Sequence, residues 1–542
     1  MFNCTGKPQK NKMPSHCVIG SGPAGAACAT ALLARGARVL MLDAGIELEP
    51  ERARLVRELA GKKFTEWEPA QIEAARGNLK ANIKGIPLKK FFGSDFPYRE
   101  TEEKIPWRAR GVGLCPSLAL GGLSNVWGAS MLPARQGDIS DWPVPNCHLA
   151  PHYRAVARMT GLAARHDDLE ELFPLHCDNP APLSAGPQAA LLLKNLQRHR
   201  LRLRKAGWHF GASRLAVRSV DSPLGCGCVY CGRCMTGCPY GCIYNSADTV
   251  RQLLLQPQEA FRYQPDVIVT HLREKGGAVV IEAFHRQTRR PLLFEAERVY
   301  LAVGVIPTAQ ILLRSQNAYD RALVLRDSQY FLFPILQGRR VRGVGQEAMH
   351  TLSQVFLELD APPISRRSVH LQIYTYSDIL GQAVRQSVGP FQLLARPLEE
   401  RLLIVQGYLH SDESSAIEMR LKRDGDKEVL ELEPKINPRT PRVIRKILRA
   451  LLGQFRALGG IVAAPLLQLA EPGRGFHSGG SIPMRAQPGE YESDCLGRPS
   501  GWSRLHIVDA SVLPTIPATT ITFPVMANAH RIGWETAGGI AK

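Results

Sequence analysis

The stretch that decides the fold runs from His16 to Gly45 and reads H-C-V-I-G-S-G-P-A-G-A-A-C-A-T-A-L-L-A-R-G-A-R-V-L-M-L-D-A-G. A short apolar strand ends at Gly20, and a helix rich in alanine and leucine follows as far as Ala34. A second apolar strand, residues 38–42, ends at Asp43. This order of strand, tight turn, helix, strand and acid is typical of a βαβ unit that binds a dinucleotide.

Three glycines in this stretch form the pattern G-x-G-x-x-G. Gly20 allows the tight turn, Gly22 lets the backbone approach a pyrophosphate, and Gly25 lets the helix pack closely on the strand. The helix N-terminus offers free N–H groups and a positive dipole end to the phosphates. Asp43 lies where a carboxylate would accept hydrogen bonds from a ribose. The pattern predicts dinucleotide binding but does not say which dinucleotide.

Composition places the chain among ordinary globular proteins. It has 542 residues, 44% hydrophobic and 22% charged, which suits several domains with a large core. No run approaches the 18 or so apolar residues of a membrane span. Met1–Met13 is polar and lysine-bearing, without the apolar core of a signal peptide. We therefore expect a cytoplasmic location, with export beside a signal-bearing partner left open.

The chain is basic, with a formal net charge of +19. Its arginines are dispersed rather than gathered with aromatic residues, so we expect no nucleic-acid partner. Residues 440–458 alternate apolar and basic side chains at helical spacing, which predicts an amphipathic helix. The favoured interpretation packs this helix on its own domain with a solvated basic face, and the alternative lays it on a membrane surface.

Further along the chain the pattern changes from helical to extended. Five segments between 351 and 433 alternate in the manner of strands, for example S-V-H-L-Q-I-Y-T-Y from Ser368 and L-L-I-V-Q-G-Y-L-H from Leu402. Such a series predicts an antiparallel sheet with one face buried and one exposed.

The C-terminal region carries a second set of motifs. They are F-H-S-G-G-S-I-P-M from Phe476, L-H-I-V-D-A-S-V-L-P from Leu505 and P-A-T-T-I-T-F-P-V-M-A-N-A-H-R-I-G from Pro517. Islands between the two ends add G-G-L-S-N-V-W-G at Gly121, D-W at Asp141 and R-V-Y-L-A-V-G-V-I-P-T at Arg298. Together with the N-terminal fingerprint, these closely resemble the glucose-methanol-choline (GMC) oxidoreductases, which are FAD-dependent and oxidise alcohols.

The resemblance implies an α/β fold with two parts. A Rossmann-like FAD-binding domain would be assembled from the discontinuous segments 1–50, 108–145, 205–310 and 471–542. A substrate-binding domain with an antiparallel β-sheet would comprise 51–107, 146–204 and 311–470. The resemblance to the β-rich part is one of architecture rather than of motif.

The resemblance also assigns catalytic positions. His477, in H-x-x-G-S, falls on the family's catalytic histidine, and an imidazole suits this role because alcohol oxidation releases a proton as well as a hydride. The family's second position, usually Asn or His, falls on Thr520, with Ile521 where a proline would stand. A threonine hydroxyl can bond a substrate alkoxide but cannot act as the base. His477 is then the sole base.

Other positions are implied for the cofactor. Asp509 and Ala510 resemble the contact with the flavin diphosphate and ribityl chain. Gly122, Ser124 and Asn125 belong to the loop that lies beside the isoalloxazine ring. Some relatives bind flavin covalently through a histidine before the tryptophan of this loop. Val126 occupies that position here, which predicts non-covalent FAD.

Six cysteines lie between Cys226 and Cys242. Four of them, Cys228, Cys231, Cys234 and Cys238, precede a proline in the spacing C-x₂-C-x₂-C-x₃-C-P of bacterial ferredoxins. They predict a [4Fe-4S] or [3Fe-4S] cluster, with Cys226 or Cys242 as a further ligand in some arrangements. Metal-free thiols, zinc and a disulfide remain alternatives.

We therefore expect an FAD-dependent dehydrogenase that oxidises an alcohol or sugar hydroxyl and passes electrons through the cluster to an acceptor protein or quinone. An oxidase that uses O₂ is the nearest alternative. A flavin and iron–sulfur electron-transfer module fed by NAD(P)H would need a second dinucleotide fingerprint, and the sequence shows none. A binding protein without activity is the third alternative. The sequence does not name the substrate.

Overall fold

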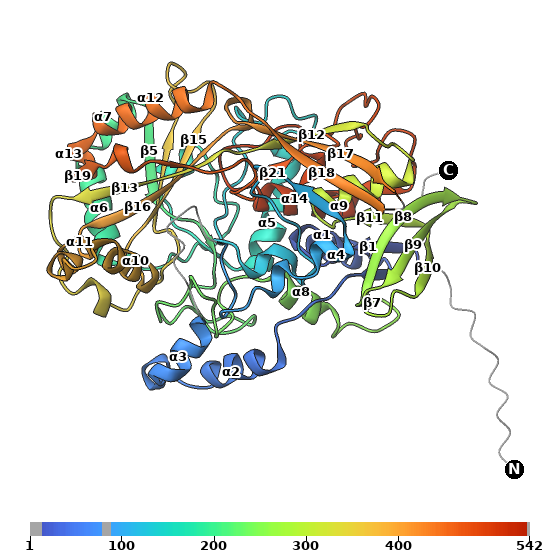
Figure 1. Ribbon diagram of the computed structural model, residues 1–542, viewed down its shortest axis with the longest axis horizontal. Coiled ribbons are helices and arrows are strands. Elements are labelled where there is room, and N and C mark those ends of the chain that lie inside the picture. Colours follow the sequence, from blue (N-terminus) through green and yellow to red (C-terminus); the bar gives the residue numbers. More distant parts are fainter. Residues whose placement is uncertain (1–13, 78–87, 426, 539–542) are drawn as a thin grey trace, which may run out of the picture.

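The dinucleotide fingerprint lies in the middle of a parallel five-stranded sheet. The computed structural model describes residues 14–77, 88–425 and 427–538, so the predicted absence of a signal in Met1–Met13 lies outside the described residues. The sheet has the order β22 (Leu505–Ile507), β11 (Arg298–Leu301), β1 (His16–Ile19), β2 (Val39–Leu42) and β7 (Phe261–Gln264). Segments from both ends of the chain therefore meet in one sheet (Figure 1).

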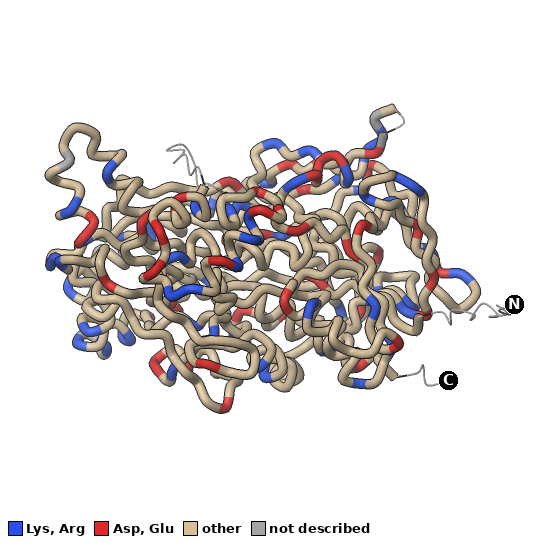
Figure 2. Tube along the Cα trace, turned by 90° about the horizontal axis from the view of Figure 1, so that it is seen from below, with Lys and Arg blue, Asp and Glu red and all other residues tan. Residues whose placement is uncertain are grey.

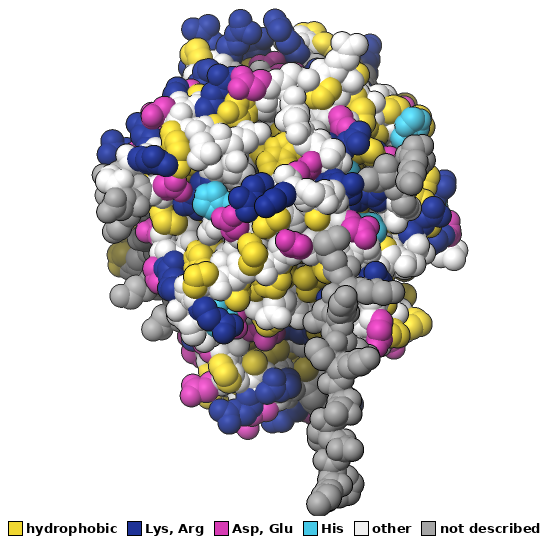
Figure 3. Space-filling model, turned by 90° about the vertical axis from the view of Figure 1, so that its right-hand side faces the viewer, with side chains coloured by type: hydrophobic (Ala, Val, Ile, Leu, Met, Phe, Trp, Pro, Cys, Tyr) yellow, Lys and Arg dark blue, Asp and Glu magenta, His cyan; other side chains and the backbone are white. Residues whose placement is uncertain are grey.

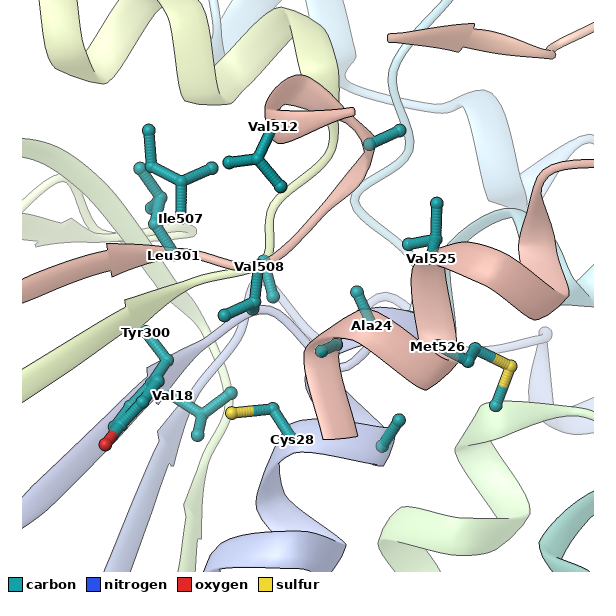
Figure 4. Packing of buried hydrophobic residues seen from close by; sticks show 14 of the residues in the cluster. Val18, Ala24, Cys28, Tyr300, Leu301, Ile507, Val508, Val512, Val525 and Met526 are labelled. Atoms are coloured by element: carbon teal, nitrogen blue, oxygen red, sulfur yellow. The ribbon is translucent and has the colours of Figure 1, made fainter. Parts of the chain in front are cut away.

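Two helices from opposite ends of the chain pack against each other below this sheet. They are α1 (Pro23–Ala34) and α14 (Thr522–Thr536). A Cβ atom at Gly533 would lie 2.8 Å from the carbonyl oxygen of Cys28, so glycine allows the close approach. Figure 4 shows Ala24 and Cys28 of α1 facing α14, with Val525 and Met526 nearby. This contact joins the two termini of the domain.

An antiparallel sheet forms the other half of the molecule. Its order is β19 (Gly460–Val462), β13 (Tyr330–Gln337), β16 (Leu402–Leu409), β15 (Val369–Tyr374), β14 (Val355–Leu359) and β5 (Trp208–Ala212), with β20 (Gln468–Leu469) also paired to β13. One face packs on α6 (Pro187–Arg198) and α12 (Thr440–Leu452) in a separate apolar core. The sequence places β5 in the nucleotide-binding part, but β5 pairs with β14 instead.

A third sheet packs on the same apolar core as the parallel sheet. Its order is β21 (Ser478–Gly479), β12 (Ala322–Asp327), β17 (Ala416–Asp424), β18 (Lys427–Lys435) and β3 (Trp107–Ala109). All five strands predicted between 351 and 433 are present, but the expectation of a single sheet is wrong, because β17 and β18 belong to this third sheet. The chain leaves β16 at the turn Ser411–Glu413, where the Ser411 amide donates to the Ile516 carbonyl. This contact with the C-terminal segment redirects the chain.

The remaining strands form two smaller sheets. One has the order β10 (Pro291–Ala296), β9 (Ala278–His285) and β8 (Val267–Lys275), and the other pairs β4 (Leu162–Ala163) with β6 (Leu215–Ala216). The other helices are α2 (Pro50–Ala60), α3 (Pro69–Arg76), α4 (Thr101–Lys104), α5 (Asn146–Thr160), α7 (Arg200–Lys205), α8 (Ser246–Leu253), α9 (Val305–Ser315), α10 (Asp378–Val388), α11 (Ala395–Glu399) and α13 (Phe455–Leu458). Within the described ranges, no helix combines the length and the apolar character needed to cross a bilayer.

The amphipathic helix predicted at 440–458 is present as α12 and α13. Val443, Ile444, Ile447 and Leu448 are buried in the core beneath the antiparallel sheet. The packing of this helix on its own domain is thus confirmed, and these four side chains are not available to a membrane.

We predict that Ile447→Ala will destabilise the protein by about 2–5 kcal/mol, because Ile447 has no exposed surface and its removal leaves a cavity. Arg445→Ala, on the exposed face of the same helix, is the matched control and should change stability by less than about 0.5 kcal/mol. Urea unfolding followed by circular dichroism measures both variants. Equal midpoints for the two variants would contradict the packing described for α12.

Candidate active site

A cavity of about 250 Å³, partly open to solvent, lies at the carboxyl ends of the parallel strands. Ligands of open α/β sheets bind at this position. Six of the nine cofactor-binding residues predicted from the sequence line the cavity, namely Gly20, Gly22, Asp43, Gly122, Asp509 and Ala510. Sequence reasoning missed other parts of the wall, including 115–118, 267–269 and the first turn of α9.

The three glycines of the fingerprint have different surroundings. Gly20 has φ +102°, and a Cβ there would lie 2.5 Å from the Ala302 carbonyl oxygen. A Cβ on Gly25 would overlap the Gly20 carbonyl oxygen, so Gly25 serves helix packing and does not line the cavity. A Cβ on Gly22 would meet no atom within 4 Å. Gly22, at the N-terminus of α1, therefore leaves open space for a group of the ligand.

Two buried aspartates hold the turns around the cavity. Asp43 accepts hydrogen bonds from the amides of Ser21 (3.1 Å) and Gly45 (3.0 Å), and burial raises its pKa to about 6. Asp509 accepts from the Gly304 amide at 2.9 Å and from the Thr308 hydroxyl at 2.6 Å, and burial raises its pKa as well. Asp509 thereby ties the C-terminal segment to the turn that starts α9.

Ser124 and Asn125 shape their loop rather than the cavity wall. The Ser124 hydroxyl donates to the Gly121 carbonyl at 2.6 Å. The Asn125 side chain donates to the carbonyls of Leu120 and Gly122. These bonds hold Gly122 against the fingerprint, where a Cβ on Gly122 would lie 3.4 Å from the Cα of Gly22. Their role as direct cofactor ligands stays a prediction.

His477 lies between two residues, Phe476 and Ser478, that line the cavity. Its Nδ1 atom is buried and has no hydrogen-bond partner. Its ring packs on that of Tyr408, with centroids 4.8 Å apart. Burial, with a smaller contribution from the charge of nearby His370, lowers the pKa of His477 to about 3. The imidazole is therefore neutral at pH 7 and able to accept a proton.

The antiparallel sheet brings a row of polar side chains to this histidine. His370 and Tyr408 are neighbours across β15 and β16, and Glu358 pairs with His370 across β14 and β15. The Glu358 carboxylate lies 2.5 Å from Nδ1 of His370, and both side chains are fully buried. The expectation of an exposed second face is thus wrong for β14 and β15, whereas β13 and β16 alternate between buried and partly exposed positions. The sequence signal for this buried polar row is the set of polar residues in S-V-H-L-Q-I-Y-T-Y. Alternation alone assigned these residues to the solvent face.

Thr520 is buried, and its hydroxyl donates to the Ser130 carbonyl at 2.8 Å. Since a hydroxyl has one proton, Thr520 in this arrangement offers a substrate only its acceptor lone pairs. The adjacent hydroxyl of Thr519 is buried without a hydrogen-bond partner. Among the described residues no hydrogen bond joins Thr520 to His477, and the catalytic role of Thr520 stays a prediction.

The four predicted cluster ligands, Cys228, Cys231, Cys234 and Cys238, line one small cavity, together with Cys242. All cysteines of this loop are free thiols, which argues against the disulfide alternative. Burial raises the pKa of Cys228 and of Cys231 to about 12, whereas hydrogen bonds from Cys242 lower the pKa of Cys238 to about 6. Among the described residues, no three His, Cys, Asp or Glu side chains converge closely enough to hold a metal ion.

The fold and the cavity define an α/β protein whose discontinuous Rossmann-like domain faces an antiparallel sheet. Neither a family model nor a curated protein sequence matches the chain. Among solved structures it is similar to pyridoxine 4-oxidase from Mesorbium loti, with 14% sequence identity and a TM-score of 0.59 over 96% of this chain and 99% of that chain. The likeness confirms the predicted GMC-like fold.

We predict that Glu358→Ala will destabilise the protein by about 3–5 kcal/mol, because it leaves His370 without its buried partner. Glu431→Ala, which breaks the partly exposed pair with Lys422 on another sheet, should cost no more than about 1 kcal/mol. Urea unfolding monitored by tryptophan fluorescence compares the two. If Glu358→Ala lowers the free energy of unfolding as little as the control does, the result would argue against a tightly bonded pair.

Proposed function

We propose that this protein is an FAD-dependent oxidoreductase that oxidises a CH–OH group of an alcohol or sugar to a carbonyl. The observation that supports the proposal is that Phe476 and Ser478, on either side of His477, line the cavity formed by the glycine fingerprint. The likeness in fold to pyridoxine 4-oxidase supports the same class of chemistry.

The residues of the cavity fit FAD. The free space at Gly22 and the start of α1 suit a diphosphate, because helix N–H groups and the dipole favour anions. Asp43 would face the adenosine ribose. When bound, FAD supplies the acceptor for the hydride that leaves the substrate carbon.

His477 would accept the proton of the substrate hydroxyl. Its neutral ring has an unpartnered nitrogen, and its packing on Tyr408 restricts its orientation. Behind Tyr408, His370 is held by its hydrogen bond to Glu358. The buried aromatic wall of Tyr408 and Tyr330, 5.2 Å apart, limits the access of water.

We predict that His477→Ala will lower turnover by roughly 10²–10⁴-fold, the usual contribution of a general base, while FAD remains bound. The wild-type kcat/KM should fall on the acid side only well below pH 6.5, the ordinary pKa of histidine, because the His477 pKa is lowered. Dye reduction across an alcohol and sugar library supplies the assay, and flavin absorbance reports occupancy.

His166→Ala, an exposed histidine away from the cavity, is the control and should leave turnover unchanged. Retained activity in His477→Ala, with flavin bound, would remove His477 from the mechanism. Thr519→Ala and Thr520→Ala, assayed under the same conditions, show which of the two hydroxyls contributes to turnover.

The proposal includes an iron–sulfur cluster held by Cys228, Cys231, Cys234 and Cys238. What supports it is their shared cavity and the amide that Thr351 donates to the Cys234 sulfur at 3.4 Å. The thiolates of a [4Fe-4S] cluster bind different irons, so their sulfurs lie further apart than around one zinc ion. The lack of a single-ion site among the described residues is therefore compatible with a cluster. Such a cluster would supply one-electron transfer.

Lys89 lies between the cysteine cavity and the loop that carries Gly122. Its Nζ donates to the Trp127 carbonyl at 3.1 Å, and the thiols of Cys234 and Cys238 are close enough to affect its pKa. Burial nevertheless lowers the pKa of Lys89 to about 8. A cation at this place would stabilise the anionic thiolate ligands.

We predict that protein isolated without oxygen will contain about four irons per chain and show an iron–sulfur EPR signal on reduction. Cys234→Ser should lose the iron, whereas Cys147→Ser, an exposed cysteine outside the loop, should retain it. About one zinc per chain, or no metal at all, would contradict the cluster and leave the flavin chemistry standing.

An oxidase is the second candidate, because the similar structure is an oxidase. Rapid peroxide formation with substrate, in protein that contains no iron, would favour O₂ as the acceptor.

A further inference from the structure

One end of the molecule presents a basic surface that the proposed redox chemistry does not use. With Ile444, Ile447 and Leu451 of α12 buried, the opposite face of the helix carries Arg442, Arg445 and Arg449, all exposed. Their spacing of three and four residues places them in one row along the helix. Leu452, three residues further, continues the row and is 40% exposed.

The short helices α7 and α13 extend this row into a surface. Arg202 of α7 donates to the Gly453 carbonyl at 2.8 Å, so α7 lies against the C-terminal end of α12. Leu201 is 82% exposed and Phe455 of α13 is 51% exposed. We call this surface the α12 end-face; it consists of Arg202, Arg442, Arg445, Arg449 and Arg456 with Leu201, Leu452 and Phe455.

The cations of the α12 end-face lack carboxylate partners. The sequence has no Asp or Glu from Ile436 to Ala470. Within the part of the chain that the structure describes, no acid pairs with any of the five arginines, whereas the neighbouring Arg200 and Arg204 pair with Asp168 and Glu171. Figure 2 shows Lys and Arg gathered at the left-hand end, where Figure 1 places α7, α12 and α13. At the opposite end, acidic and basic side chains are interspersed (Figure 3).

Arginines without carboxylate partners, beside exposed apolar side chains, match the interface of an anionic bilayer. Basic residues near such a surface are attracted by its negative potential, and leucine and phenylalanine side chains enter the boundary between headgroups and acyl chains. A single-stranded nucleic acid would instead need several aromatic side chains for base stacking, and this surface has only Phe455. We propose that the α12 end-face docks the protein on membranes that contain anionic phospholipids.

In this arrangement α12 does not insert its apolar face, which stays in the protein core. The arginine row meets the headgroups, and Leu201, Leu452 and Phe455 enter the boundary below them. The proposal is independent of the redox chemistry, since none of these residues lines the cofactor cavity.

Vesicle flotation with the full-length protein tests the docking. We expect binding to vesicles of phosphatidylcholine with phosphatidylglycerol, and little binding to phosphatidylcholine alone. Arg442→Gln/Arg445→Gln/Arg449→Gln should weaken binding to the anionic vesicles roughly a hundredfold, given the usual contribution of each cation near the surface. Leu201→Ser/Phe455→Ser should weaken the binding that remains in high salt, where the electrostatic part is screened.

The control removes the same charge elsewhere. Arg54→Gln/Arg57→Gln/Lys63→Gln, all exposed on or just after α2, should leave binding unchanged. An equal loss in both triple variants would show that net charge alone causes binding and would overturn the proposal. Failure to bind anionic vesicles, or variant-sensitive binding to a DNA duplex in place of vesicles, would overturn it too. Circular dichroism and flavin content confirm that the variants remain folded.

Discussion

The contact between α1 and α14 is the constraint on which the candidate site depends. The helices come from opposite ends of the chain, and the close approach at Gly533 and Cys28 holds them together. This packing places the C-terminal segment beside the glycine fingerprint. Asp509 then accepts a hydrogen bond from the Gly304 amide and fixes the turn at the start of α9, which lines the cavity. Without this packing, Gly22 and Asp509 would not line the same cavity.

In the second half of the molecule, the antiparallel sheet carries a row of polar side chains that ends beside His477. The antiparallel sheet buries apolar side chains against α6 and α12 on one face. On the other face it carries Glu358, His370 and Tyr408 at the same level of neighbouring strands. Placing a charged pair in a dry interior is unfavourable unless the partners bond well, as Glu358 and His370 do at 2.5 Å. We interpret the pair as support for His477, whose ring contacts Tyr408.

Local signals predicted much of this arrangement. The fingerprint, the acid at Asp43 and the helix to Ala34 follow from turn chemistry and periodicity, and each strand between 351 and 433 was expected from its alternation. The division of those strands between two sheets was not predictable, because the turn at Ser411 is held by Ile516, more than a hundred residues away. The burial of His370 was missed for a similar reason: alternation shows that two faces differ, but not what covers each.

The sequence by itself determined that a dinucleotide fingerprint is present, that His477 lies in a histidine motif and that four cysteines follow a cluster-binding spacing, because each of these is a pattern of neighbouring residues. Only the tertiary structure decided that Ser124 and Asn125 form hydrogen bonds within their loop and that the Thr520 hydroxyl donates a hydrogen bond to the Ser130 carbonyl. The shared cavity of the four cysteines is likewise a tertiary feature. The tertiary structure also decided that α12 buries its apolar face and leaves its arginines to solvent. The physical reason is that hydrogen-bond partners and burial are set by segments distant in the chain, which periodicity and spacing do not record.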